Sequence, residues 1–307
     1  MNVPQQSDVP AGSLAGSLTW ASSRQAYYTI RFLADPDRMA DAFRAYGYFR
    51  WVDDELDGRR MEKSERVAFA LRENALLDRC YRGDWPPSSS DEERMLIDLI
   101  RGDREPCSGL QSYLRHMMAV MVFDAERRGR PISRDELESY TSHLAIAVTD
   151  ALHFFIGHGC ALPKTKDRYL AACGAHVVHM LRDTQEDVAN GYYNVPREFL
   201  EARQLDPCEV GSEAYCEWFQ GRAQLARAWF QAGRNYLHQL PSPRCRLAGS
   251  AYLTRFEATL EAIACCGYRV RPKYPQSEAP VATLRMAAST LWLSLRPRRL
   301  GALPRPL

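Results

Sequence analysis

The sequence predicts an all-α protein, and three observations carry that prediction. Segments in which polar and apolar residues alternate, as they do in half-buried strands, are almost absent. Two Ser/Glu pairs, Ser90–Glu93 and Ser133–Glu136, have the spacing of the capping box that begins a helix. Clusters of Pro and Gly separate the long helical segments. No shift in composition divides the 307 residues, so we expect one domain of about ten helices.

The order of helices and breaks follows from the same signals. Residues 1–18 are rich in Pro, Gly and Ser and are expected to be loose. Breaks are expected at ADPD, GHGCALP, NGYYNVP, PSP and RPKYP, and Gly58 is expected as a helix C-cap. The expected helices cover residues 20–33, 37–56, a segment that opens at Ser90, 137–156, 163–188, 211–239, 244–267 and 279–295. The helical domain then spans residues 19–295, and a basic, Pro-rich tail occupies residues 296–307.

The composition excludes several classes of protein. The formal net charge is only +2, and the basic residues are dispersed outside the C-terminal tail, so no nucleic-acid partner is expected. Nine cysteines without a CxxC pair fit neither a disulfide framework nor a zinc site. The N-terminus lacks the charged start and apolar core of a signal peptide, and no segment is apolar for long enough to span a bilayer. A cytoplasmic location is expected.

One short segment, YGYFRWVDDELDG, gathers an unusual number of carboxylates on a predicted helix. Asp53 and Asp57 are four residues apart and therefore share a helix face, with Asp54 close by and Arg50 one turn earlier. Like charges at this spacing weaken a helix. A solvated, salt-bridged helix face is one explanation, and a bound cation is the other.

A second segment, HMLRDTQEDVANG, repeats the pattern much later in the chain. Asp183 and Asp187 again have i,i+4 spacing, and Arg182 directly precedes the first of them. If the two clusters face each other in a bundle, cations are needed, because unit charges ~4 Å apart interact by about 4 kcal/mol at an effective dielectric near 20. Oxygen ligands on rigid helices suit Mg²⁺ with substrate phosphates. The Glu-x-x-His pairs of a di-iron site are absent from the sequence.

These two segments resemble the first and second aspartate-rich motifs of the squalene/phytoene synthase family. The resemblance covers residues 20–275 and includes Tyr140 and, near the end, Tyr252 with ATLEAIACCGYRV. It implies the isoprenoid synthase fold, a single helical bundle with a central cavity. It also implies that Mg²⁺ assists the ionisation of an allylic prenyl diphosphate to a carbocation, since metal ions and arginines neutralise the leaving group.

The resemblance also assigns roles to individual residues. Metal ligands would be Asp53, Asp54, Asp57, Asp183 and Asp187, and the catalytic set would be Asp53, Asp57, Asp183, Asp187 and Tyr140. Arg50 and Arg182 would grip phosphate oxygens, for which the guanidinium fork is suited. Tyr46, Tyr140 and Tyr252 would line the cavity, where aromatic faces stabilise a cation. For each tyrosine a simple packing role is an equally good explanation.

The central helix departs from the family pattern. After Tyr140 the family has an A-G-x-V-G pattern, whose glycines leave room for a prenyl chain. Here the stretch is YTSHLAIAVTD, with Ile146 and Thr149 where the glycines would fall. Both are substrate-binding candidates, since their branched side chains would narrow a prenyl channel. Asp150 follows and is out of place in a hydrocarbon channel, unless it faces solvent or caps a neighbouring group.

Further departures surround the second motif. The family's R-G-R-x-Y-L-P is here NGYYNVP, so Asn190 and Tyr192 replace two arginines and Asn194 replaces a tyrosine. His179 replaces an asparagine and is read as a core histidine or as a further metal or phosphate contact. With fewer cations, a second diphosphate is not expected.

These departures favour the phytoene-synthase-like aromatic prenyltransferase branch of the family. The expected function is therefore transfer of a short prenyl group to a small aromatic acceptor, such as a carbazole, in secondary metabolism. Dimethylallyl diphosphate is the expected prenyl donor. Asp150, His143 or the released diphosphate would remove the ring proton. The alternatives are head-to-head condensation of two prenyl diphosphates, cyclisation of one prenyl diphosphate, and a helical scaffold without catalysis.

The C-terminal segment LWLSLRPRRLGALPRPL mixes Trp292 with arginines and prolines. Weak contact with an anionic membrane surface is one hypothesis for it, and a disordered basic tail is the other. The sequence leaves the oligomeric state open.

Overall fold

The computed structural model describes residues 13–58, 61–87, 90–157 and 165–275. The predicted all-α class is confirmed, since these residues form eleven helices and one isolated parallel bridge between Pro131 and Tyr193. The helices are α1 (Leu14–Ser22), α2 (Arg24–Leu33), α3 (Met39–Asp57), α4 (Lys63–Tyr81), α5 (Asp91–Gly102), α6 (Gly109–Arg127), α7 (Arg134–Phe155), α8 (Asp167–Ala189), α9 (Arg197–Arg203), α10 (Glu213–Gln239) and α11 (Pro243–Cys265).

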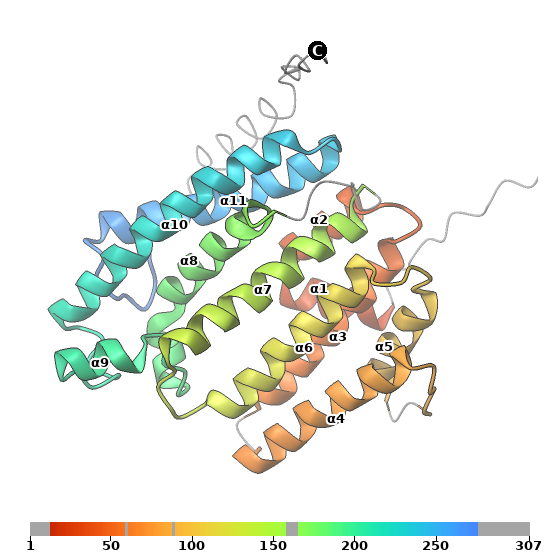
Figure 1. The fold of residues 1–307 in the computed structure, drawn as a ribbon, viewed down its shortest axis with the longest axis horizontal. Coiled ribbons are helices and arrows are strands. Elements are labelled where there is room, and N and C mark those ends of the chain that lie inside the picture. Colours follow the sequence, from red (N-terminus) through yellow and green to blue (C-terminus); the bar gives the residue numbers. More distant parts are fainter. Residues whose placement is uncertain (1–12, 59–60, 88–89, 158–164, 276–307) are drawn as a thin grey trace, which may run out of the picture.

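The long helices form one bundle around a shared core. Helices α6, α7 and α8 lie side by side in its middle, with α10 and α11 beyond α8 and with α4 and α5 on the opposite side (Figure 1). Helix α3 packs against α1, α5 and α6. One hydrophobic cluster runs through nearly all of these elements and includes the fully buried Tyr48, Tyr215, Phe219 and Phe230. The aspartate-rich segments of α3 and α8 are therefore held by one core.

The N-terminal helices differ from those expected. Helix α1 begins at Leu14, inside the segment that we expected to be loose. The single helix expected over residues 20–33 is wrong, because the chain breaks at Ser23, whose backbone is extended (φ −153°, ψ 102°). The Ser23 side chain accepts a hydrogen bond from the backbone N–H of Ala26 and so begins α2. Helices α4, α6 and α9 were not among the predicted segments.

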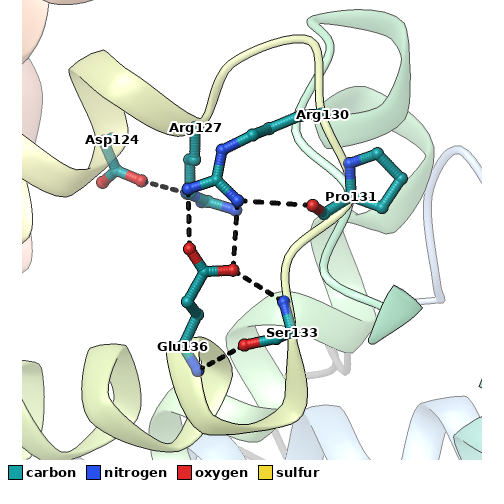
Figure 2. Close-up of polar contacts among 6 residues, drawn as sticks. All are labelled: Asp124, Arg127, Arg130, Pro131, Ser133 and Glu136. Atoms are coloured by element: carbon teal, nitrogen blue, oxygen red, sulfur yellow. Dashed lines mark hydrogen bonds and ion pairs between the residues drawn. The ribbon is translucent and has the colours of Figure 1, made fainter. Parts of the chain in front are cut away.

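The predicted capping signals act as helix starts. At the start of α7, Ser133 Oγ accepts from the Glu136 N–H at 3.1 Å, and Glu136 Oε2 accepts from the Ser133 N–H at 2.7 Å (Figure 2). Arg130 holds Glu136 from the preceding turn through two further hydrogen bonds, at 3.0 and 2.7 Å (Figure 2). Ser90 caps α5 by accepting from the Glu93 N–H. Gly58 is the C-cap of α3, as expected.

Close contact between α8 and α10 requires small residues. A Cβ on Gly233 would lie 2.6 Å from the Ala171 Cβ, and one on Gly174 would lie 2.7 Å from the Phe230 ring. Because such distances are sterically forbidden, only glycine permits these helices to approach so closely. This packing fixes the position of α8.

Some expectations concern residues outside the described ranges. The helix expected at residues 279–295, the tail at 296–307 and most of the break GHGCALP are among them. Within the described residues, no helix is both long and apolar enough to cross a bilayer.

Candidate active site

The two aspartate-rich segments lie at the C-terminal ends of their helices, α3 and α8. The last turn of neither helix contains a basic residue. Since the C-terminal end of a helix carries a partial negative charge, carboxylates are unfavourable there unless positive groups compensate them. Local helix energetics therefore oppose this arrangement, which points to a positive partner supplied by other elements or by a ligand.

Arginines within each segment supply part of the compensation. Arg50 Nη1 donates to Asp53 Oδ2 at 3.0 Å, and Nη2 donates to Asp54 Oδ1. On α8, Arg182 donates to both carboxylate oxygens of Asp183 at 2.6 Å. His179 completes this group, with Nδ1 3.2 Å from Asp183 Oδ2.

The two segments meet around Asp124 of α6, which the sequence analysis missed. Asp124 is close enough that its charge raises the pKa values of Asp53, Asp57 and Asp187. Tyr140 donates its hydroxyl to Asp124 Oδ2 at 2.9 Å. The structure thus brings carboxylates from α3, α6 and α8 to one place, with Tyr140 in contact.

Arg127 connects this group to the segment after α8. It is 5% exposed, and its Nε donates to Asp124 Oδ1 at 2.5 Å (Figure 2). Its Nη1 donates to Asn194 Oδ1 at 2.8 Å, and Asn194 Nδ2 donates to Asp187 Oδ2 at 2.7 Å. The Arg127 guanidinium also lies 4.8 Å from the centre of the Tyr140 ring. The asparagine that replaces a family tyrosine therefore orients the second motif.

Three carboxyl groups remain incompletely compensated by positive charge. Burial, reinforced by Asp57, raises the pKa of Asp53 to about 6. Burial, reinforced by Asp183, raises the pKa of Asp187 to about 7. Burial and then Asp124 raise the pKa of Asp57 as well. A cation at this place would restore the ionised forms.

Positive charge is crowded nearby in the same way. Arg255 of α11 lies close to Arg182, and burial together with this neighbour lowers the pKa of the Arg255 guanidinium. Arg50, Arg255, Tyr46 and Tyr252 line the mouth of one cavity. Crowded arginines favour an anion with several oxygens, such as a diphosphate.

The donor set fits Mg²⁺ bound together with a diphosphate. Undercompensated carboxylates are hard oxygen ligands, and the adjacent arginines suit the phosphate oxygens that Mg²⁺ also binds. In the described part of the chain, no three His, Cys, Asp or Glu side chains are already arranged as a metal cluster. Three of the carboxylates are instead in ion pairs: Arg50 pairs with Asp53 and Asp54, and Arg182 pairs with Asp183.

The predicted central cavity is present, with a volume of about 540 Å³. This volume is typical of ligand sites. Its charged end, called the mouth, is formed by Arg50, Asp53 and Arg255. The rest of the lining is mostly apolar, with Ser23, Gln25 and Thr29 as polar exceptions. Helices α2, α3, α6, α7 and α11 line it, and its apolar walls are formed by Ile30, Ala34, Ala42, Ala45, Phe49, Met117, Met121, Leu144, Val148, Ala151, Leu152, Phe155 and Ile156. The carboxylates thus stand at one end of a hydrocarbon-lined space.

Ile146 and Thr149 are not among the residues that line this cavity. The face of α7 that does so carries Leu144, Val148 and Leu152, which follow one another one turn apart. Ile146 is off this face, and Thr149 is buried beside it. Ile146 and Thr149 align in sequence with the family glycines. Which side chains face the cavity, however, depends on how α7 is rotated about its axis.

The proposed proton acceptors are engaged elsewhere. Asp150 is 2% exposed and accepts hydrogen bonds from Arg168 at 2.7 Å and from Ser112 at 2.6 Å. It joins α6, α7 and α8 as part of a buried ion pair and does not line the cavity. His143 contacts His116, with 2.7 Å between the Nδ1 atoms, and lines a separate groove between α6 and α7. Asp150 as a base is therefore not supported.

Two arginines of α6 lie beside NGYYNVP, the segment that lacks two arginines of the family pattern. Arg127 and Arg128 lie 4.9 and 5.8 Å from the Tyr192 ring. Arg128 also donates to the Asn190 carbonyl oxygen at 2.9 Å. Its positive charge counteracts part of the rise in the pKa of Asp57 that burial and Asp124 cause. Two arginines of α6 therefore place positive charge beside this segment.

The residues that sequence analysis missed are Asp124, Arg127, Arg128 and Arg255. Asn194 was noted only as a replaced tyrosine, and its hydrogen bond to Asp187 was not expected. The sequence VFDAERRGR held a weak signal, because it repeats a carboxylate followed by arginines at helical spacing. Arg255, one turn after Tyr252, could have been found from helical spacing alone.

Comparison with known proteins agrees with this geometry. The family model described as squalene/phytoene synthase matches residues 20–285. No curated protein matches the chain. Among solved structures, squalene synthase HpnC from Alicyclobacillus acidocaldarius is 19% identical with a TM-score of 0.65, over 84% of this chain and 94% of that one. A dehydrosqualene synthase in complex with ligand is 14% identical with a TM-score of 0.69, over 91% of this chain and 95% of that one. These likenesses establish the isoprenoid synthase fold.

Proposed function

The chain belongs to the squalene/phytoene synthase family, and from that premise we propose that it condenses two long prenyl diphosphates head to head with the help of Mg²⁺. The observation that carries the proposal is the cavity, which starts at Arg50 and Asp53 and continues between apolar walls. Ala42 and Asp53, both in its wall, are about 16 Å apart along α3 at 1.5 Å per residue. A dimethylallyl group would leave most of this space unfilled.

The residues at the mouth have separate tasks. Asp53, Asp57, Asp183 and Asp187 would hold Mg²⁺, and Asp54 stands at their edge. Bound Mg²⁺ supplies Lewis-acid neutralisation of the leaving diphosphate. Arg50, Arg182 and Arg255 would hold the diphosphate oxygens as the C–O bond breaks, since guanidinium groups stabilise the charge that develops there.

The aromatic side chains would stabilise the prenyl carbocation that remains after the diphosphate has left. Tyr46 and Tyr252 line the mouth, and their ring faces stabilise positive charge without providing a strong nucleophile. The apolar walls exclude water, so that the double bond of a second prenyl group rather than a hydroxyl captures the cation. Joining the two prenyl groups at their C1 carbons breaks both C–O bonds and forms one net C–C bond. Two diphosphates leave, and they take up the two protons lost from the joined carbon skeleton.

Head-to-head condensation replaces the aromatic acceptor as the preferred hypothesis. The two structural neighbours are named as a squalene synthase and a dehydrosqualene synthase, and nothing in the comparisons supports a carbazole acceptor. One of the sequence arguments for that acceptor, the plug at Ile146, is not supported by the geometry, because Ile146 does not line the cavity. The argument from lost cations is weakened by Arg127 and Arg128, which lie beside Tyr192. A scaffold without catalysis has no need for a cluster of carboxylates and arginines at the end of a cavity.

The test measures diphosphate release with Mg²⁺ from dimethylallyl, geranyl, farnesyl and geranylgeranyl diphosphates, each with and without carbazole, followed by product mass. We expect farnesyl or geranylgeranyl diphosphate alone to give a product with twice the prenyl carbon count. Turnover of dimethylallyl diphosphate only with carbazole present would instead establish an aromatic prenyltransferase.

Asp53→Asn and Asp183→Asn should each lower turnover by about 100-fold or more with the circular dichroism spectrum unchanged. Glu55→Gln is the matched control, since Glu55 is an exposed carboxylate in the same segment. Near-normal activity of both aspartate variants would refute the magnesium assignment.

A further inference from the structure

The outer surface of α1 and α2 is unusually apolar. Of the six large hydrophobic side chains that are exposed in the described residues, four are on these two helices: Leu14, Trp20, Tyr28 and Phe32. Phe32 is 71% exposed. Its ring stacks on Tyr28 at 5.9 Å, and Trp20 contacts Tyr28 edge-on at 5.7 Å. The rings of Trp20, Tyr28 and Phe32 are in contact with one another, and together with the exposed Leu14 at the start of α1 these residues are called the α1–α2 patch.

The charged residues on the two helices of the α1–α2 patch are all positive. Residues 14–33 contain Arg24 and Arg31 and no Asp or Glu. Both arginines are exposed, and the Arg24 guanidinium lies 5.3 Å from the Trp20 ring. Beyond α2, Asp35 is buried and paired with Arg244, and the exposed Asp37 follows. The patch therefore presents aromatic rings flanked by positive charge.

The opposite face of α2 is a wall of the central cavity. Ala26, Thr29 and Ile30 line it. No residue of α2 is fully buried, so the helix is a thin partition with the cavity on one side and the outside on the other. Helix α2 lies near the C-terminal end of α7 (Figure 1), and Asp35 N–H donates to the Phe155 carbonyl oxygen there at 2.8 Å.

We propose that the α1–α2 patch docks this protein on the surface of an anionic lipid bilayer. Trp and Tyr favour the headgroup region, where one end of the ring is wet and the other is apolar. Phe32 would enter the acyl boundary, and Arg24 and Arg31 would meet lipid phosphates. Docking here places the thin wall of the cavity against the phase in which prenyl chains dissolve.

A second copy of the chain is a weaker candidate for the same surface. In a two-fold dimer the patch would meet itself, so Arg24 and Arg31 would face the same arginines with no carboxylate of residues 14–33 between them. Anionic lipid headgroups instead compensate that charge. Docking on a bilayer is independent of the proposed reaction, so it can be tested by measuring binding to vesicles without any substrate.

The test is sedimentation of the full-length protein with vesicles of neutral phosphatidylcholine and with vesicles containing anionic phosphatidylglycerol. We expect binding to the anionic vesicles. Tyr28→Ser/Phe32→Ser should weaken it about ten-fold or more, from the lost burial of two rings. Arg24→Gln/Arg31→Gln should weaken it by a similar factor and remove the preference for anionic lipid.

Leu71→Ser and Trp85→Ser are the matched controls, because these side chains are 49% and 40% exposed but belong to other elements. They should bind vesicles like the original chain, and thermal melting should show that every variant is folded. Unchanged binding of the Tyr28/Phe32 variant, or equal loss in the controls, would overturn the proposal. So would binding that disappears only on removal of residues 276–307, or a patch variant that changes the sedimentation coefficient from dimer to monomer without affecting vesicle binding.

Discussion

At the scale of single residues, Asp124 is held by two hydrogen bonds, and its charge acts on carboxylates of both aspartate-rich helices. It accepts from Arg127 and Tyr140 and stands near Asp57 and Asp187. The carboxylate thus orients a buried arginine and a tyrosine while it adds to the negative field that a cation would neutralise. We regard it as a positioning residue for the metal-binding carboxylates.

Asp124→Asn should lower kcat by about 10–100-fold, as is usual when a group that orients metal ligands is lost. The concentration of Mg²⁺ for half-maximal activity should rise, because part of the negative field is removed. Glu126→Gln is the control, since Glu126 is an exposed carboxylate two residues away on α6. A loss of thermal stability with unchanged Mg²⁺ dependence would show that Asp124 is merely structural.

At the scale of elements, helical phase separates residues that the sequence places together. On α7, Val148 lines the cavity and Ile146, two positions earlier, does not. Asp150, two positions later, pairs with Arg168 of α8 instead. Removing one partner of such a buried pair typically costs about 3–5 kcal/mol. Neighbouring positions of α7 therefore serve the cavity and the stability of the bundle separately.

Val148→Phe should shorten the longest prenyl diphosphate that the protein accepts, because the larger ring projects into the cavity. Ile146→Phe should leave the chain-length profile unchanged. The measurement is the relative kcat/KM for geranyl, farnesyl and geranylgeranyl diphosphates. The opposite pattern, with Ile146→Phe alone changing the profile, would show that the cavity assignment is wrong.

At the scale of the whole molecule, the active site opposes folding when no cation is bound. The raised pKa values of Asp53 and Asp187, about 6 and about 7, mean that the folded protein holds protons that the unfolded chain releases near pH 4. Stability of the metal-free protein therefore falls as the pH rises through this range. His176 and His153 act in the opposite sense, because burial lowers their pKa values to about 3 and about 4. Their contribution is lost as the pH falls below about 6.5.

Between about pH 6.5 and about pH 8, the Tm of the metal-free protein should fall relative to that of the Asp187→Asn variant, which keeps the buried histidines but lacks this carboxyl. Saturating Mg²⁺ should raise the Tm of the original protein more at the higher pH, where ionised carboxylates are available to it. Asp187→Asn should reduce this Mg²⁺ effect. Equal Mg²⁺ stabilisation at both pH values, in both proteins, would contradict the proposed site.

Much of the fold could be read from local signals. Ser133 and Glu136 begin α7 as predicted, because a capping box involves only neighbouring residues. The break at Ser23 was missed, since serine is common inside segments that read as helices and only its extended backbone reveals the cap. Helix bounds therefore follow from the sequence to within a turn where capping is strong, and less well elsewhere.

Local patterns were enough to predict the all-α class, the family and the two aspartate-rich segments, because helix caps, breaks and i,i+4 spacing involve residues near one another in the chain. The packed bundle was needed to show that Asp124 and Arg127 join the site, and that Val148 rather than Ile146 faces the cavity. These contacts join residues far apart in the chain, and their formation depends on how α6, α7 and α11 are rotated about their axes. That rotation is fixed by packing of the whole bundle, including the glycine contacts between α8 and α10, and no local pattern encodes it.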